Sequence, residues 1–239
     1  MSAERFLAAV EVSGAAFGMQ LHADKFQLLQ VGPASPVRNT AGDIIEQKAH
    51  MLYLGASITD DGRIQGELSR RIGAANADFR ALARVWRQSS LTRCRKLEIF
   101  NATICSKLTY GLAAACLNVA ERRRLDGFHN RCLRQVWGIK PAYVSRISNK
   151  VVLARTEQKP ITQNLAKQQL LMYGKVARAP AGGLLRDSAF CPGTLHPVTD
   201  KYIRKRGRPC IEWVAEVTKL AVRMVGAYHK IHGTQVGSF

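Results

Sequence analysis

The sequence lacks a hydrophobic run long enough to cross a bilayer. Its longest weakly polar stretch, residues 108–120, has 13 residues and is interrupted by Thr109, Tyr110, Gly111 and Asn118, whereas a membrane-spanning helix needs about 20 apolar residues. The N-terminus also has no basic segment followed by an apolar one, which is the pattern of a secretory signal peptide. We therefore expect an intracellular protein with no membrane partner, whose six cysteines are reduced thiols.

Aromatic residues, prolines and acidic residues are all scarce. Aromatics make up 7% of the chain and there are 8 prolines in 239 residues, which excludes a collagen-like or low-complexity chain. The 46% of hydrophobic residues is enough to build a core, which excludes global disorder. Only 17 Asp+Glu face 36 Lys+Arg, giving a net charge of +19 and a pI of about 10.2. This excess favours nucleic acid as the partner, with an anionic membrane surface as the alternative.

The positive charge is confined to part of the chain. Residues 1–62 carry 4 basic and 7 acidic side chains, residues 63–150 carry 18 and 5, and residues 151–239 carry 14 and 5. The basic part begins abruptly at Arg63. We therefore expect the nucleic-acid contacts to lie after residue 62.

Recognisable catalytic motifs are missing as well. The sequence has no phosphate-binding P-loop, no nucleophile elbow and no zinc-protease helix. The pair Asp60-Asp61 lies between Thr59 and Gly62, which is typical of a solvated turn rather than a two-metal site. His129 with Cys132, and Cys191 with His196, could each supply two metal ligands, but neither has a second pair at zinc spacing. We assign no catalytic and no metal-binding residue.

Hydrophobic periodicity predicts a mainly α fold with a small N-terminal α+β part. The apolar spacing indicates a first helix over residues 4–17, followed by two short β-type runs and a small antiparallel sheet. After residue 62 the period becomes helical throughout. The expected elements are β runs over 26–31 and 51–54, and helices over 63–86, 94–117, 125–136, 148–155, 161–178 and 211–228.

Three cysteines recur at a spacing of 11 residues in the second long helix. Cys94, Cys105 and Cys116 would lie about 16 Å apart along one helix, too far for a disulfide, which needs Cα atoms within about 7 Å. Because 11 residues make almost three full turns, the three thiols are expected to share the apolar face and pack in the core.

Two basic clusters are candidates for phosphate contact. One begins the third helix of the basic region, where only Glu121 and Asp126 offset five arginines: Arg122, Arg123, Arg124, Arg131 and Arg134. The other contains Arg204, Lys205, Arg206 and Arg208 around an Arg-Gly-Arg-Pro sequence. This second cluster could enter a narrow minor groove, act as a nuclear-import stretch, or simply precede the helix that Pro209 starts.

The order of several short motifs resembles the C-terminal portion of a non-LTR (LINE-type) retrotransposon reverse transcriptase. Each motif is weak alone, and the resemblance depends on their collinearity over nearly the whole chain. The motifs are Phe17-Gly18-Met19-Gln20-Leu21 with Lys25, Tyr53-Leu54-Gly55 with Asp61-Gly62, Arg71-Ile72, Tyr110-Gly111, Phe128-His129 with Arg131-Cys132-Leu133-Arg134, Gly174 with Arg178, and Gly207-Arg208-Pro209 with Trp213.

This resemblance implies a palm remnant over 1–62 with a primer-grip-like hairpin, a helical thumb-like bundle over 63–140 and a basic helical C-terminal extension over 141–239. Tyr53, Leu54 and Gly55 would position a primer backbone, and Lys25 would approach the phosphates of an incoming nucleotide. Further contacts to template-primer are expected from Arg70, Arg71, Lys96 and the two basic clusters. The aspartates that hold Mg²⁺ in the intact RNA-directed DNA polymerase are expected upstream of Met1, so this chain would carry no cofactor.

The function expected from these features is binding of RNA or DNA by a polymerase fragment that is not catalytic alone. An upstream catalytic half is an expected partner, and the nucleus or a cytoplasmic ribonucleoprotein is the expected location. Two alternatives remain open at this point. One is a stand-alone nucleic-acid-binding helical module that selects A·T-rich DNA through its Arg-Gly-Arg-Pro element, and the other is a retrotransposon relic without function.

Overall fold

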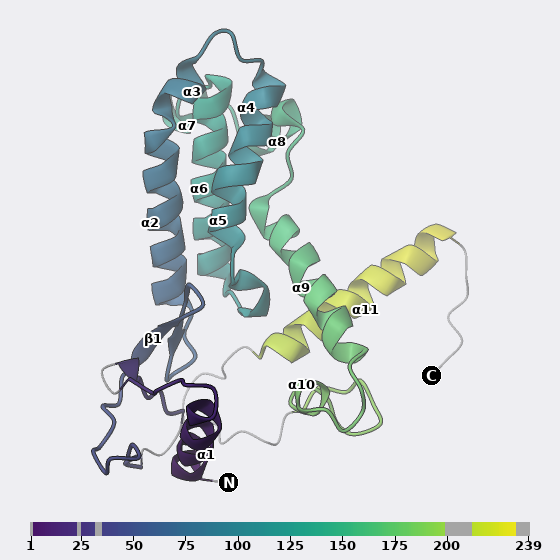
Figure 1. Ribbon diagram of the computed structural model, residues 1–239. Coiled ribbons are helices and arrows are strands. Elements are labelled where there is room, and N and C mark those ends of the chain that lie inside the picture. Colours follow the sequence, from purple (N-terminus) through teal and green to yellow (C-terminus); the bar gives the residue numbers. More distant parts are fainter. Residues whose placement is uncertain (1, 23–24, 32–34, 199–211, 233–239) are drawn as a thin grey trace. The chain divides into compact units, whose positions relative to one another are not determined.

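The computed structural model describes residues 2–22, 25–31, 35–198 and 212–232, including the side chains of the last helix up to residue 226. The chain divides into two compact units, Met1–Glu67 and Leu68–Phe239. Helices dominate the described residues, whose sheet has two strands (Figure 1). The prediction of a mainly α fold is therefore confirmed.

The first unit begins with helix α1 (Ala3–Ala15), as the apolar spacing predicted. The Oγ of Ser2 caps it by accepting the N–H of Arg5 at 3.3 Å. The helix fully buries none of its side chains: Phe6 is 59% exposed, and Phe17, just after its end, is 81% exposed. Its apolar side chains thus form no closed core within this unit.

A β-hairpin follows, made of β1 (His50–Tyr53) and β2 (Ala56–Thr59). Tyr53 pairs with Ala56, which leaves Leu54 and Gly55 as a two-residue turn. The predicted strand over 51–54 is confirmed, whereas the one over 26–31 is wrong. Leu28 forms only an isolated bridge with Gln47, because a β-type sequence forms a strand only where a neighbouring strand continues the ladder.

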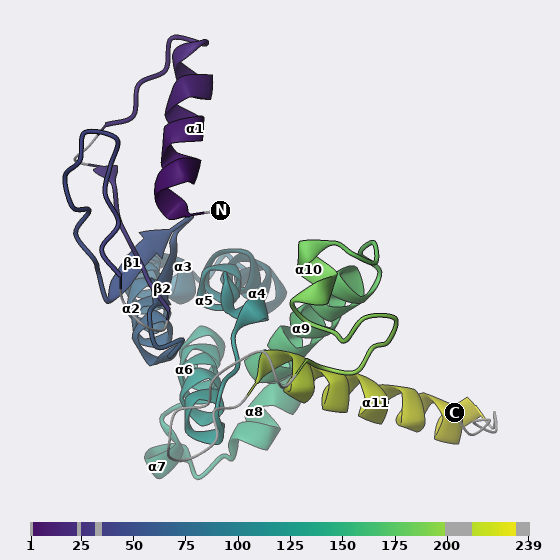
Figure 2. The ribbon, with the colours of Figure 1, turned by 90° about the horizontal axis from the view of Figure 1, so that it is seen from below.

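The second unit consists of helices packed around α6 (Val119–Trp137). This helix packs against α3, α4, α8 and α9 (Figures 1 and 2). No described helix is both long and apolar enough to cross a membrane. The other helices are α2 (Gln65–Ala81), whose first residues belong to the first unit, α3 (Ala83–Arg87), α4 (Arg93–Phe100), α5 (Ser106–Thr109), α7 (Ala142–Ser145), α8 (Asn149–Thr156), α9 (Ile161–Ala177), α10 (Leu184–Asp187) and α11 (Trp213–His232).

The helix expected over 94–117 is shorter and less regular than predicted. A π-helical turn, η2 (Asn101–Cys105), joins α4 to α5, and Gly111 ends the run with a φ of 75° before a short 3₁₀ turn, η3 (Leu112–Ala114). Cys94 is exposed, Cys105 is buried and Cys116 is half-buried. The expectation of one shared cysteine face is therefore wrong, because the π turn and the early end change the register.

Aromatic residues form the centre of the core of the second unit. Phe79 stacks on Trp86 with 5.1 Å between ring centroids, and Phe100 meets both rings edge-on. The Nε1–H of Trp86 donates to the carbonyl of Phe79 at 2.8 Å, so its polar end is satisfied inside the core. The same unit fully buries several aliphatic side chains: Leu68, Ile104, Leu108, Leu125 and Leu133.

A smaller core joins α9, α10 and α11. Phe190 is 1% exposed and meets the ring of Tyr173 edge-on at 5.4 Å. Helix α11 is fixed at its start, where the Nε1–H of Trp213 donates to the carbonyl of Ala113 at 2.8 Å. One turn later Val217 is 3% exposed. The first half of α11 is thus anchored to the helical unit.

His129 lies in the core without a hydrogen-bond partner among the described residues. The side chain is 1% exposed, and its ring lies 5.6 Å from that of Phe100. Neither Nδ1 nor Nε2 is bonded. Burial lowers the pKa of His129 to about 4, although the charge of Asp126 acts in the opposite direction. The imidazole is therefore neutral in the folded protein near neutral pH.

We expect the free energy of unfolding to decrease as the pH falls below about 6.5. Unfolded His129 takes up a proton near its ordinary pKa of 6.5, whereas the folded residue does so only near 4. The neutral His129 therefore costs no stability above its unfolded pKa. Between the two pKa values the unfolded state takes up a proton that the folded state does not, and this lowers the free energy of unfolding by about 3 kcal/mol. Urea unfolding followed by circular dichroism measures it, with His129→Leu expected to lack this loss and the exposed-site variant His196→Gln to retain it. Parallel pH profiles for wild type and His129→Leu would contradict the prediction.

Candidate nucleic-acid interface

The hairpin of the first unit presents the predicted primer-grip residues at its tip. Tyr53 and Leu54 are 58% and 76% exposed. Leu54 and Gly55 have φ values of 48° and 76°, the combination of a type I′ turn, in which Asn or Gly normally occupies the first position. A leucine in this backbone region is strained by about 1 kcal/mol or more. The hairpin therefore holds an apolar side chain in a costly position at its exposed end.

Lys25 lies in the same unit but on a different segment. Its side chain is exposed, and its backbone N–H donates to the carbonyl of His22 at 3.0 Å. The acidic pair is part of a turn, as expected from the sequence. Asp61 accepts the N–H of Arg63 at 2.9 Å and forms an ion pair with its guanidinium at 3.3 Å.

Three of the predicted phosphate-binding cations lie inside the helical unit. Arg71, Lys96 and Arg134 are 7%, 9% and 6% exposed. The guanidinium of Arg71 covers the ring of Tyr110, 4.6 Å from its centroid. The Nζ of Lys96 donates to the carbonyl of Trp86 at 2.9 Å. These three residues therefore stabilise the fold and do not form an open surface, and their expected contact with template-primer stays a prediction.

Arg134 makes three of these internal bonds. Its guanidinium donates to the carbonyl of Ile147 at 2.7 Å, to Oδ1 of Asn149 at 2.9 Å and to the carbonyl of Lys140 at 3.4 Å. It thereby fixes the loop and the short helix α7 that connect α6 to α8.

Three of the other arginines of α6, Arg123, Arg124 and Arg131, are exposed on one side of the helix. Arg124 and Arg131 are seven residues apart, which places them on the same face two turns from each other. Arg124 donates to the Oγ of Ser69 on α2 at 2.9 Å, and the guanidinium of Arg131 covers Phe128 at 5.3 Å. Arg123 and, on α2, Arg70 are also exposed. We call Arg123, Arg124 and Arg131 the α6 arginine row.

Gly127 lies within this row, between Arg124 and Arg131. A Cβ at this position would have no atom within 4 Å, so packing inside the protein does not require a glycine. In the middle of a helix a glycine costs about 0.5–1 kcal/mol relative to alanine. The backbone of α6 is thus left uncovered between two arginines.

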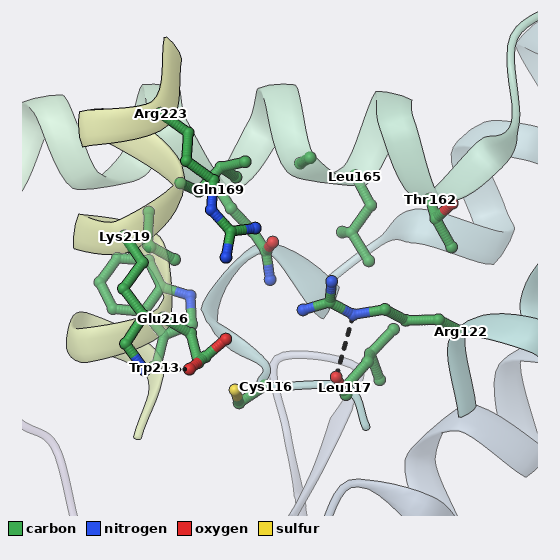
Figure 3. Close-up of a pocket in the computed structure, with 13 residues that line it drawn as sticks. Cys116, Leu117, Arg122, Thr162, Leu165, Gln169, Trp213, Glu216, Lys219 and Arg223 are labelled. Carbon is green, nitrogen blue, oxygen red and sulfur yellow. Dashed lines mark hydrogen bonds and ion pairs between the residues drawn. The ribbon is translucent and has the colours of Figure 1, made fainter. Parts of the chain in front are cut away.

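Arg122 points to the other side of α6, toward α11. Its Nε–H donates to the carbonyl of Leu117 at 3.0 Å, and its guanidinium lines a cleft between α9 and α11 (Figure 3). Lys219 and Arg223, which were not among the predicted site residues, line the same cleft from α11. Their spacing of four residues on a predicted helix was the signal that could have indicated a basic face.

The second basic cluster, with Arg204, Lys205, Arg206 and Arg208, lies outside the described residues. Within the described ranges, no three His, Cys, Asp or Glu side chains gather as possible metal ligands. Cys105 and Cys132 are buried, and burial raises the pKa of each thiol to about 12. Both therefore remain protonated near neutral pH and act as core residues.

No protein-family model matches the sequence, and neither a curated protein nor a solved structure matches it. The resemblance to retrotransposon reverse transcriptases stays a prediction from the order of its motifs.

The different roles of Arg134 and Arg131 can be separated by substitution. Arg134→Gln is expected to lower the free energy of unfolding by about 2–3 kcal/mol, because buried carbonyl groups lose their donor. Arg131→Gln should change it by no more than about 0.5 kcal/mol. Urea unfolding of the two variants and wild type provides the measurement, and equal effects of the two substitutions would be inconsistent with these assignments.

Proposed function

We propose that this chain binds RNA or DNA through phosphate contacts along the α6 arginine row, as the thumb-like part of a polymerase related to retrotransposon reverse transcriptases. The chain is proposed to be a fragment of such an RNA-directed DNA polymerase and to have no catalytic activity alone. Arg70 on α2 and the hairpin tip with Tyr53, Leu54 and Gly55 are proposed as further contacts, and Lys25 as a contact to a nucleotide phosphate.

The observation that carries this proposal is that the two carboxylates of α6 are already engaged elsewhere. Glu121 accepts the backbone N–H of Asn118 at 2.8 Å in a capping box. Asp126 accepts the N–H and the Oγ1–H of Thr162 at 3.1 and 2.8 Å. Neither carboxylate is therefore bonded to an arginine of the row. The arginines can bind phosphate, which arginine recognises by bidentate hydrogen bonds.

The first unit supports the proposal that a catalytic half of the polymerase is a partner. Among the hydrophobic side chains of its described residues, Val37 is buried, whereas those of α1 are not. Phe6, Val12 and Phe17 are each more than half exposed. Apolar surface of this extent commonly marks a protein interface. We infer that α1 packs against another polypeptide segment in the assembled polymerase.

Salt titration of binding to an RNA–DNA hybrid tests the proposed phosphate contacts. Fluorescence anisotropy should show log K falling linearly with log salt concentration, with a slope of about −0.9 for each neutralised phosphate. The double variant Arg123→Gln/Arg131→Gln should make this slope less steep by about 2. Lys150→Gln/Arg155→Gln removes the same charge from exposed positions on α8 and should leave the slope near the wild-type value. An affinity independent of salt would contradict the proposed function.

Gly127→Glu should make the protein more stable and a weaker binder. Glutamate is a better helix former than glycine, so the free energy of unfolding should rise by about 0.5 kcal/mol. The introduced carboxylate lies one turn from both Arg124 and Arg131, and its repulsion of phosphate should weaken binding about fivefold. Ala154→Glu, at an exposed position of α8, adds the same charge and should change the affinity less than about twofold. If both variants bind equally well, the row is not the contact surface.

A further inference from the structure

A cleft in the second unit opens between α9 and α11 and is separate from the α6 arginine row. Its floor is formed by Cys116 and Leu117, and its walls include Leu165 and Gln169 of α9 and Trp213 of α11. Figure 3 shows the guanidinium groups of Arg122 and Arg223 directed into the same space from different helices. Two cations that are 101 positions apart in the sequence thus meet at one site.

The walls of the cleft are fixed by hydrogen bonds. Gln169 is 8% exposed, and its Nε2 donates to the carbonyl of Ala115 at 2.7 Å. Trp213 is held by the carbonyl of Ala113, and Arg122 by that of Leu117. The bond of Arg122 uses its Nε–H, and its two Nη groups make no hydrogen bond within the described part of the chain. These Nη groups can therefore donate to a ligand without disturbing the fold.

Positive charge prevails inside the cleft. The cations are Arg122, Lys219 and Arg223, and the one carboxylate among the lining residues is that of Glu216. Lys219 donates to Glu216 at 2.9 Å, so these two charges compensate each other. The hydrogen bond from Lys219, together with the charges of Lys219, Arg122 and Arg223, lowers the pKa of Glu216. Glu216 is bonded to Lys219, and its single negative charge is smaller than the positive charge of the three cations that line the cleft.

We propose that this cleft binds one phosphate group of a nucleic-acid strand between Arg122 and Arg223. The choice of nucleic acid as the source rests on the proposed function, whereas the recognition of a phosphate ester rests on the cleft alone. The volume of the cleft is about 90 Å³, several times the roughly 10–15 Å³ that holds one water molecule. This space suits a phosphate group, and the attached nucleoside would extend toward solvent.

A nuclear magnetic resonance titration with thymidine 5′-phosphate tests binding at the cleft directly. The indole Nε1–H of Trp213 lies in the wall and reports on occupancy, and that of Trp86 in the core serves as an internal reference. We expect a saturable shift of the Trp213 signal with no shift of the Trp86 signal. Thymidine without phosphate is expected to cause no shift. An equal response to thymidine, or no response to the phosphate ester, would overturn the proposal.

Two substitutions in the cleft should act in opposite directions. Arg223→Gln removes a charged donor and should weaken thymidine 5′-phosphate binding about fivefold. Glu216→Gln removes the negative charge and releases Lys219, so binding should strengthen about threefold. Arg155→Gln on α8 removes the same charge as Arg223→Gln outside the cleft and should have less than a twofold effect. Weakening by both cleft variants would indicate a structural effect and would overturn the proposal.

The same variants measured with a labelled single-stranded oligonucleotide test whether the phosphate belongs to a bound strand. Opposite changes for Arg223→Gln and Glu216→Gln are expected there as well. If the oligonucleotide binds but neither substitution alters its affinity, the strand does not enter the cleft and its assignment to nucleic acid is wrong. If no oligonucleotide binds while thymidine 5′-phosphate still does, the proposed function fails and the phosphate site remains.

Discussion

The helical unit depends on the hydrogen bonds that α6 makes to the elements around it. Asp126 holds the first turn of α9 through Thr162, and Arg134 holds the segment that leads to α8. Arg124 reaches Ser69 on α2. Each of these bonds comes from a charged side chain, and bonds to charged groups are about twice as strong as neutral ones. Some charged side chains of α6 therefore hold neighbouring elements in place, and others form an exposed surface.

The buried face of α6 could be predicted from the sequence, but the division of its charges could not. The apolar spacing predicted a helix over 125–136, and in the structure α6 ends at Gly138, whose φ is 72°. Arg131 and Arg134 are equivalent by composition. They differ because the loop after α6 returns with carbonyl groups only beside Arg134, and that return is a tertiary feature that periodicity does not encode.

The cleft between α9 and α11 is likewise a tertiary feature that could not be predicted from helical periodicity. Its two guanidinium groups come from Arg122, at the start of α6, and Arg223, in the middle of α11. Helical periodicity predicted α6 and α11 but not how the two helices are placed in space. The placement of α11 depends on the bond from Trp213 to Ala113. By contrast, the hairpin tip at Tyr53, Leu54 and Gly55 is a local feature, and its position was implied by the resemblance, whereas the strand predicted over 51–54 included the turn residue Leu54.

The π-helical turn η2 changes the helical register of the residues that follow it, but only over a short segment of the chain. A π turn accommodates an extra residue within a helix and rotates the residues that follow it. Here only α5 follows before Gly111 adopts a left-handed conformation and ends the run. The altered register is therefore confined to a single helical turn and does not reach α6. An insertion or deletion in this segment would therefore change the helical register only locally and would leave the packing of α6 in the core unchanged.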